Sequence, residues 1–403
     1  MTKTCIFLAA AFLLLLQACC YADTWNLFYN GSYHSVNSMA AYNGKLYIGN
    51  GWFEQGESDI YAYNETAWSL SYDGNKTTVP CMAVYSGKLY AGIEGGYQGD
   101  GDVITYDGTA WKTSLEGPGD MIASLAVYNS KLYAGTGSFN GSVYVYDGAT
   151  WQMVYNANGS DSKVASLTAY NGKLYAGFLR GTGWGVIRSY DGTNWTNVYG
   201  RYAGAGTYSL TVYGGKLYAG LGSIYGQGVI LAYNGSVWTD SYSPSAYSII
   251  WALLEYDGRL YAATQGEYSN QGNVLVYDGS NWSVSYADEY NAVNSLALYD
   301  GRLYAGKGTQ AGFGDVIVLA STTTSTTTTS TTMSPTSTTT TTSLTTSTTQ
   351  GICIMPGNVA PCEMITLPEV VSVINEWAAG SLSLQEVIDL IDSWADPATY
   401  PPA

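Results

Sequence analysis

An eight-residue phrase, Tyr-Asn-Gly-Lys-Leu-Tyr-Ala-Gly or a close variant, recurs along this 403-residue chain. Its second tyrosine falls at Tyr47, Tyr90, Tyr133, Tyr175, Tyr218, Tyr261 and Tyr304, so the spacing is always 42 or 43 residues. A repeat of constant length indicates one supersecondary unit that buries its apolar face by packing against copies of itself. The chain is therefore expected to contain a domain built from seven similar units.

Each unit has the pattern of four short strands. In the third unit the expected strands cover 124–128, 131–135 and 142–146, and a fourth begins at Trp151. In most units Asn-Gly or Asp-Gly separates the first two strands, and these dipeptides favour two-residue hairpin turns. Four antiparallel strands in 43 residues is the size of a β-propeller blade, and the period-2 pattern excludes helical repeats.

The tryptophan that starts each fourth strand predicts how the ring closes. These tryptophans are Trp25, Trp68, Trp111, Trp151, Trp195, Trp238 and Trp282, and the first precedes any complete unit. The seventh unit ends after its third strand, 315–319, so residues 24–29 are expected to supply its missing outer strand. Such pairing of the two chain ends removes an open sheet edge. We expect an all-β, seven-bladed propeller over residues 23–320.

A hydrophobic strand that ends near glycine, followed by a tyrosine and then a tryptophan, resembles the repeat of kelch and galactose-oxidase-like propellers. Ala134-Gly135 stands where the kelch motif has two glycines, and four residues separate Tyr146 from Trp151. The resemblance implies the propeller fold and transfers no catalytic site. The single histidine, His34, cannot build a multi-histidine copper or zinc centre.

The N-terminus has the features of an export signal. Lys3 is followed by the apolar run 6–16, which is too short to span a membrane, and residues 1–22 are expected to form a signal peptide. Two processing routes stay open: cleavage after Ala22, or lipid attachment at Cys19. Either route predicts an extracellular or cell-surface protein. Eight Asn-x-Ser/Thr sequons permit glycosylation there.

Two further regions follow the repeats. Residues 321–350 are almost entirely threonine and serine and are expected to form an unfolded stalk. Residues 351–403 contain two related segments with helix-capping signals, which predict a helical hairpin and faintly resemble a dockerin without its calcium loop. Cys353 and Cys362 are spaced for a local disulfide. The module is expected to be a helical cap or to dock onto an envelope partner.

Irregular loops between the second and third strands contain the candidate binding residues. Each of these loops contains an aromatic residue that we expect to bind a ligand: Trp52, Tyr97, Phe139, Trp184, Tyr225, Tyr268 and Phe313. The connections between blades share that face and add Tyr33, Tyr202, Tyr208, Tyr247 and Tyr290. Exposed aromatic rings stack on sugars and anchor protein partners, so a carbohydrate or a surface protein is the expected ligand. The alternative is that these rings fill gaps between blades.

Acidic residues gather in the same loops. They are Glu54, Glu57, Asp59, Glu94, Asp100, Asp102, Glu267, Asp288, Glu289 and Asp315. Asp100 and Asp102 are a weak calcium candidate, solvated loops being the alternative, and no other cofactor is expected. A net charge of −16 argues against nucleic acid as a partner.

No convincing catalytic constellation is present, so a non-catalytic binding or adhesion protein is the leading expectation. A polysaccharide-cleaving hydrolase or lyase that uses two loop carboxylates is one alternative. A structural envelope component is another. Cys81 occupies the register of Ser38 and Ser124, which favours a small buried residue over a nucleophile.

Overall fold

The computed structural model describes residues 23–320 except 32–34, 52–57, 97–99, 138–139, 160, 180–183, 203–205, 224–227, 244–246, 267–270 and 309–313. The signal segment, the threonine/serine stretch, the tail with Cys353 and Cys362, and the processing sites Cys19 and Ala22 lie outside the described residues. The described part contains 28 strands and no helix. None of its elements is a helix long and apolar enough to cross a membrane.

Hairpin pairing joins the strands four at a time into antiparallel sheets. The first three groups are β2 (Ser35–Tyr42), β3 (Lys45–Gly51), β4 (Ile60–Tyr63), β5 (Trp68–Tyr72); β6 (Thr78–Tyr85), β7 (Lys88–Glu94), β8 (Val103–Tyr106), β9 (Trp111–Leu115); and β10 (Met121–Tyr128), β11 (Lys131–Gly137), β12 (Ser142–Tyr146), β13 (Trp151–Asn156). Single residue pairs, Gly51 with Thr78 and Glu94 with Met121, link these three groups.

The next three groups are separate sheets. They are β14 (Lys163–Tyr170), β15 (Lys173–Leu179), β16 (Trp184–Tyr190), β17 (Trp195–Tyr202); β18 (Gly206–Tyr213), β19 (Lys216–Gly222), β20 (Val229–Tyr233), β21 (Trp238–Tyr242); and β22 (Tyr247–Tyr256), β23 (Arg259–Gly266), β24 (Gly272–Tyr277), β25 (Trp282–Asp288).

The remaining sheet combines both ends of the repeat region. Its strands are β26 (Ala292–Tyr299), β27 (Arg302–Gly308), β28 (Asp315–Leu319) and β1 (Trp25–Asn30). As predicted, β1 pairs antiparallel with β28, and Trp25 lies opposite Leu319. Trp25 also donates from its indole nitrogen to the Ser285 hydroxyl of the neighbouring sheet, at 2.9 Å.

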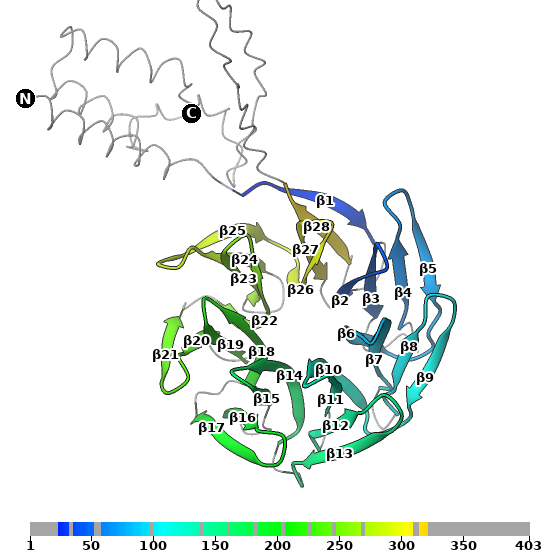
Figure 1. Ribbon diagram of the computed structural model, residues 1–403. Helices are drawn as coiled ribbons and strands as arrows, with labels where there is room; N and C mark the ends of the chain where they lie inside the picture. The colour runs from blue at the N-terminus through cyan, green and yellow to red at the C-terminus, as the bar shows by residue number, and fades with distance from the viewer. Residues whose placement is uncertain are drawn as a thin grey trace, which may run out of the picture. The chain divides into compact units, whose positions relative to one another are not determined.

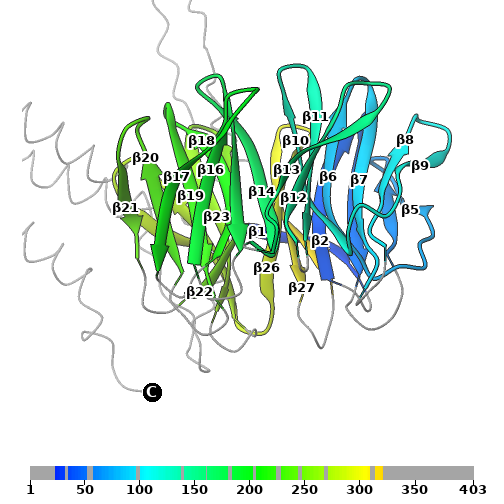
Figure 2. The same ribbon diagram turned by 90° about the horizontal axis from the view of Figure 1, so that it is seen from below.

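The sheets stand side by side around a central axis, with the first strand of each group innermost and the fourth at the rim (Figure 1). In side view the strands run from one face of the ring to the other (Figure 2). The inner strands are longer than predicted: β10 begins at Met121 rather than Ser124, because a bulge after Ile122 allows pairing to continue.

The repeated apolar residues pack between neighbouring sheets. The leucine of each Lys/Arg-Leu-Tyr sequence is fully buried, and the tyrosine after it is at most 5 % exposed. One cluster joins Val36 and Leu46 of the first group to Tyr304 and Val316 of the last, which closes the ring. A Cβ atom added to Gly135 would lie 2.7 Å from the Val164 side chain, so glycine lets adjacent sheets approach closely.

The first tyrosine of the phrase links each hairpin to the next. Tyr128, for example, donates from its hydroxyl to the backbone oxygen of Gly172 at 2.8 Å. The same bond recurs from Tyr42, Tyr85, Tyr170, Tyr213, Tyr256 and Tyr299, at 2.9 to 3.1 Å. The last of these returns from Tyr299 to Gly44 of the first hairpin, so this hydrogen-bond circuit is also closed.

Candidate functional site

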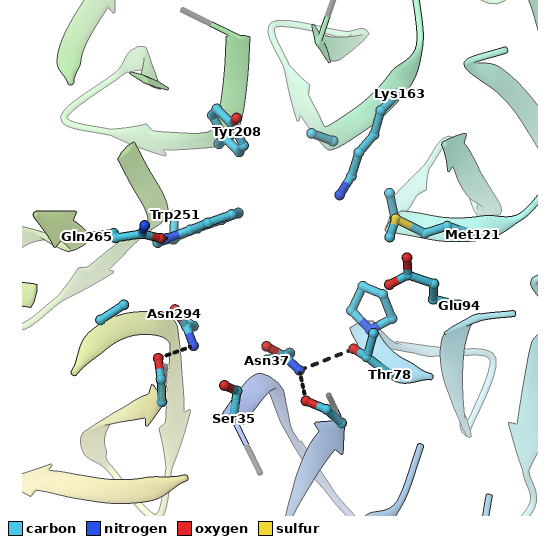
Figure 3. A pocket seen from close by; sticks show the side chains of 16 residues that line it. Ser35, Asn37, Thr78, Glu94, Met121, Lys163, Tyr208, Trp251, Gln265 and Asn294 are labelled. Carbon is cyan, nitrogen blue, oxygen red and sulfur yellow. Dashed lines mark hydrogen bonds between the residues drawn. The ribbon is translucent and has the colours of Figure 1, made fainter. Parts of the chain in front are cut away.

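A cavity of about 410 Å³ lies where the inner strands converge (Figure 3). Its walls come from the beginnings of the first strands and the ends of the second strands of several sheets. The lining residues are Ser35, Asn37, Gly51, Thr78, Pro80, Glu94, Met121, Ala123, Lys163, Ala165, Tyr208, Trp251, Gln265, Ala292, Asn294 and Gly308. In the sequence, Gly51 directly precedes the predicted ligand-binding residue Trp52, and Gly308 lies five residues before Phe313.

The lining breaks the repeat that the scaffold follows. Four residues after the second tyrosine, four units have glycine, whereas the second, fourth and sixth have Glu94, Leu179 and Gln265; of these three, Glu94 and Gln265 line the cavity. Ten residues before that tyrosine, the residue changes from unit to unit: Asn37, Pro80, Ala123, Ala165, Tyr208, Trp251 and Asn294. The cavity is therefore chemically asymmetric within a nearly symmetric ring.

Two aromatic rings form one wall. Tyr208 on β18 and Trp251 on β22 meet edge to face, with ring centroids 5.0 Å apart and planes at 75°. The indole nitrogen of Trp251 donates to the side-chain oxygen of Gln265 at 2.9 Å, which fixes the indole orientation. Burial raises the pKa of the Tyr208 phenol. This wall offers an apolar, half-buried ring face with an amide beside it.

Two asparagines form an adjacent polar wall. Asn37 donates from its amide nitrogen to the Gly51 backbone oxygen at 3.2 Å and to the Thr78 hydroxyl at 3.1 Å. Asn294 donates in the same way to the Gly308 backbone oxygen, also at 3.2 Å. These bonds use the nitrogens, and among the described residues no donor is found for the two amide oxygens. Each oxygen can accept a hydrogen bond from a ligand.

A carboxylate and an ammonium group complete the lining. Glu94, at the end of β7, is only 5 % exposed, and Lys163 begins β14. Both side chains point into the cavity from different sheets (Figure 3). Burial raises the pKa of Glu94, an effect that Lys163 opposes and Asp120 reinforces. Burial also lowers the pKa of Lys163, against the attraction of Glu94. Each group is thus held in an environment that disfavours its charge.

Most of the predicted ligand-binding aromatics lie outside the described residues. These are Trp52, Tyr97, Phe139, Tyr225, Tyr268 and Phe313. The loop assignment of Trp184 was wrong, because Trp184 begins β16 and its backbone pairs with Tyr202. Tyr208 was also expected in a connection between blades, but it lies within β18 and lines the cavity. Tyr290 does lie in a connection and is 75 % exposed.

Several acidic residues were wrongly expected to lie in solvated loops. Lys307 is buried and forms ion pairs with Asp288 at 2.8 Å and with Asp315 at 3.4 Å. Asp102 pairs with Lys76 at 2.6 Å, and the Lys76 ammonium also contacts the backbone oxygen of Asp100. The Lys76 ammonium therefore lies against the Asp102 carboxylate of the calcium candidate, which stays a prediction. No group of three or more metal-binding His, Cys, Asp or Glu side chains occurs within the described residues.

Sequence reasoning did not single out Trp251, Gln265, Lys163, Asn37 or Asn294. The sequence signal for these residues is departure from the repeat on the inner strands, which the irregularity of the loops does not indicate. Trp251 was in addition hidden in an apolar run, Ile249-Ile250-Trp251, that resembles core. The interpretation of Cys81 as a small structural residue agrees with the structure: its thiol contacts the Ile122 backbone oxygen at 3.4 Å, and burial raises its pKa to about 12.

Comparison with solved structures identifies the fold. A chain in the crystal structure of the mitotic checkpoint complex matches with a TM-score of 0.55 at 15 % identity, covering 73 % of this chain and 95 % of that chain. The structure of U3-55K matches with a TM-score of 0.51 at 14 % identity, covering 74 % and 99 %. At these identities the likeness shows the β-propeller fold alone. No protein-family model matches the sequence, and no curated protein matches it.

Proposed function

We propose that this protein is an exported, non-catalytic binding protein that receives part of a carbohydrate in its central cavity. One observation carries the proposal: four side chains of the lining, Glu94, Tyr208, Trp251 and Gln265, are larger or more polar than the glycine or alanine that other units have at the same repeat positions. A purely structural centre would be served by the glycines and small residues of the other units. Trp251, Tyr208, Gln265 and Glu94 instead give one concave site of about 410 Å³ with an aromatic wall and convergent polar groups.

A carbohydrate ligand fits this lining better than a protein partner does. The pyranose ring has apolar C–H faces that pack on Trp251 or Tyr208, and hydroxyls that bond to amides and charged groups. Protein partners are usually held over about 800 Å² of surface on each side, far more than one small concavity offers.

A seven-bladed ring of the kelch-like type is the scaffold we propose. Its support is the grouping of 28 strands in fours and the closed circuit of tyrosine bonds from Tyr42 to Tyr299. The Tyr–Trp pairs of the repeat stack across their turns, as Tyr146 and Trp151 do at 5.0 Å. Export rests on residues 1–22, and the stretch 321–350 would hold the propeller away from the surface on which residues 351–403 dock.

The composition of the lining supports binding rather than hydrolysis. Glycoside hydrolysis generally requires two carboxyl groups at a defined separation. Among the described residues that line the cavity, Glu94 is the one carboxylate. Asp120 lies close enough to affect the pKa of Glu94, but it is not part of the lining.

The test is a glycan-binding measurement with a matched aromatic control. Trp251→Ala is expected to weaken binding of the full chain to glycan conjugates by at least about tenfold, which corresponds to about 1.4 kcal/mol. Tyr290→Ala removes an aromatic side chain that is 75 % exposed and outside the lining, and should leave binding unchanged. Thermal unfolding of both variants confirms that they fold. Equal binding by folded Trp251→Ala and the unaltered protein would reject the cavity as the site.

A further inference from the structure

We propose that the cavity selects the uncharged terminal pyranose of a glycan, with Glu94 and Lys163 each bonded to a different sugar hydroxyl. This inference rests on the proposed function and specifies its ligand. It predicts discrimination against sugars that bear a carboxylate, such as glucuronic acid, and against sugars that bear an ammonium group, such as glucosamine.

The two charged groups of the cavity are placed differently from the other buried charges of the protein. Elsewhere in this protein, buried carboxylates are paired directly: Asp161 contacts Arg188 at 2.8 Å, and Asp288 contacts Lys307 at the same distance. Glu94 and Lys163 line the same cavity yet form no ion pair with each other. No hydrogen bond to either charged group is found among the described residues. A carboxylate and an ammonium kept apart in this way leave space and bonding capacity for a ligand between them.

The formal charges of the cavity lining are balanced. Glu94 and Lys163 are the charged residues in the described lining, so their formal charges cancel. A ligand with a net charge would meet one attractive and one repulsive group, and would bring its own desolvation cost into a partly buried site. A sugar hydroxyl is both donor and acceptor, so one hydroxyl can donate to Glu94 while another accepts from Lys163. An uncharged polyol therefore satisfies both groups without leaving an excess charge.

The aromatic wall and the two charged groups lie on different strands. Trp251 and Tyr208 lie on strands β22 and β18, whereas Glu94 lies on β7 and Lys163 on β14 (Figure 3). A ring packed on the aromatic wall presents its hydroxyls to the other side of the cavity. The amide oxygens of Asn37 and Asn294 can accept bonds from hydroxyls that reach neither charged group.

The experiment measures sugar preference in charge variants of the full chain. The probes are polymer-linked glucose, galactose and mannose, together with glucuronic acid and glucosamine on the same polymer. The unaltered protein is expected to bind at least one neutral conjugate about tenfold more tightly than either charged conjugate. Glu94→Gln leaves Lys163 unbalanced and should move the preference toward glucuronic acid. Lys163→Met leaves Glu94 unbalanced and should move it toward glucosamine.

Matched controls remove the same charges outside the cavity. Glu289→Gln and Lys112→Met alter exposed residues, and the Lys112 side chain is 70 % exposed. Both should keep the original preference, and thermal unfolding verifies that every variant folds. Preference of the unaltered protein for a charged conjugate, or unchanged preference in both cavity variants, overturns this inference but leaves carbohydrate binding standing. Failure to bind any conjugate overturns the proposed function as well.

Discussion

Ser295 donates a hydrogen bond from its hydroxyl to the backbone oxygen of Val36 at 3.0 Å, although the two residues are 259 positions apart in the chain. The bond joins the last sheet to the first and is one of a series. Ser38, Ser124 and Ser209 donate in the same way to Val79, Val164 and Ile250, at 2.6 to 3.0 Å. These serines connect the innermost strands of adjacent sheets.

Removal of one of these hydroxyls should lower the free energy of unfolding by the net contribution of one buried hydrogen bond. Ser124→Ala is expected to lower the free energy of unfolding by about 1 kcal/mol. Ser166 occupies the same register, but its buried hydroxyl has no partner among the described residues. Ser166→Ala should therefore change stability little, or raise it. Urea unfolding compares the two variants, and an equal loss in both would contradict a role for the hydrogen bond.

Glu65 adopts a backbone conformation that suits glycine. Its φ angle is +73°, whereas glycine occupies the equivalent turn position at Gly108 and Gly192, with φ of +97° and +104°. Glu65→Gly is expected to raise the free energy of unfolding by about 1 kcal/mol, because the left-handed region is unfavourable for residues with a Cβ atom. Thermal or urea unfolding measures the change.

Two control variants separate backbone strain from side-chain effects. Glu65→Ala removes the side chain but keeps the Cβ atom, so it should give no comparable gain. Gly192→Ala should lower stability by about 1 kcal/mol, since a Cβ atom there meets no neighbouring atom and the cost is conformational. A gain in Glu65→Ala equal to that in Glu65→Gly would show that the side chain, not the backbone, is the cause.

The buried tyrosines of the repeat predict alkaline instability. Burial is the largest cause that raises the pKa of Tyr47, Tyr133, Tyr175, Tyr218, Tyr261 and Tyr304 to about 12. In the unfolded chain these phenols ionise near pH 10, so the unfolded state loses protons first and is favoured as pH rises. This stability is fully present below about pH 10 and is lost progressively toward pH 12.

Urea midpoints measured across this alkaline range test the prediction, with phenolate absorbance recorded in parallel. The buried tyrosines should ionise together with loss of the fold rather than before it. Tyr218→Phe removes one of these groups and should make the decline in stability shallower. Complete phenolate formation in a protein that is still folded would be the contrary result.

The buried Lys307 neutralises two carboxylates, so its loss should destabilise the fold. Its ammonium forms ion pairs with Asp288 and Asp315 and donates a hydrogen bond to the Tyr286 hydroxyl at 3.2 Å. Burial lowers the pKa of Lys307, but Asp288 and Tyr286 outweigh this effect and raise the pKa to about 12. Lys307→Met leaves two carboxylates without their cation and should lower the free energy of unfolding by about 3–5 kcal/mol.

Two further variants check that the loss comes from unpaired charge. Addition of Asp288→Asn to Lys307→Met should recover part of the stability. Lys112→Met, at an exposed position, should stay within about 0.5 kcal/mol of the unaltered protein. If Lys307→Met lowers the free energy of unfolding as little as Lys112→Met does, the ion pairs of Lys307 do not stabilise the fold.

The repeat alone was enough to predict the strand pattern and the pairing of the two chain ends. This is possible because the tyrosine and tryptophan spacing records a unit that must pack on its neighbours. No complete unit precedes Trp25, and no tryptophan follows Asp315–Leu319 in the seventh unit. One end of the repeat region therefore has a single extra strand, and the other end lacks one. The all-β arrangement and the β1–β28 pair confirm these expectations.

The site was harder to predict from the sequence. Periodicity shows the residues that all units share, whereas a site is made of residues that differ between units. Glu94, Lys163, Tyr208 and Trp251 are up to 157 residues apart in the sequence, and only ring closure brings them to one cavity. Each lies in a strand beside a buried residue, such as Ile93 or Ile250, so the local pattern does not distinguish them from the core.

One departure from the repeat depends on a contact that the sequence alone does not show. Ala252 replaces the inner-ring serine in the sixth unit, and the residue paired with it is Ala263 rather than glycine. In the first unit a Cβ atom on Gly49 would lie 2.6 Å from the Ser38 hydroxyl, so the hydroxyl and the Cβ atom exclude each other. The sequence determined the repeat, the strand order and the closure, since these follow from local period and count. Only the tertiary structure decided which residues meet across the axis, because those contacts depend on the packing of sheets that are distant in the chain.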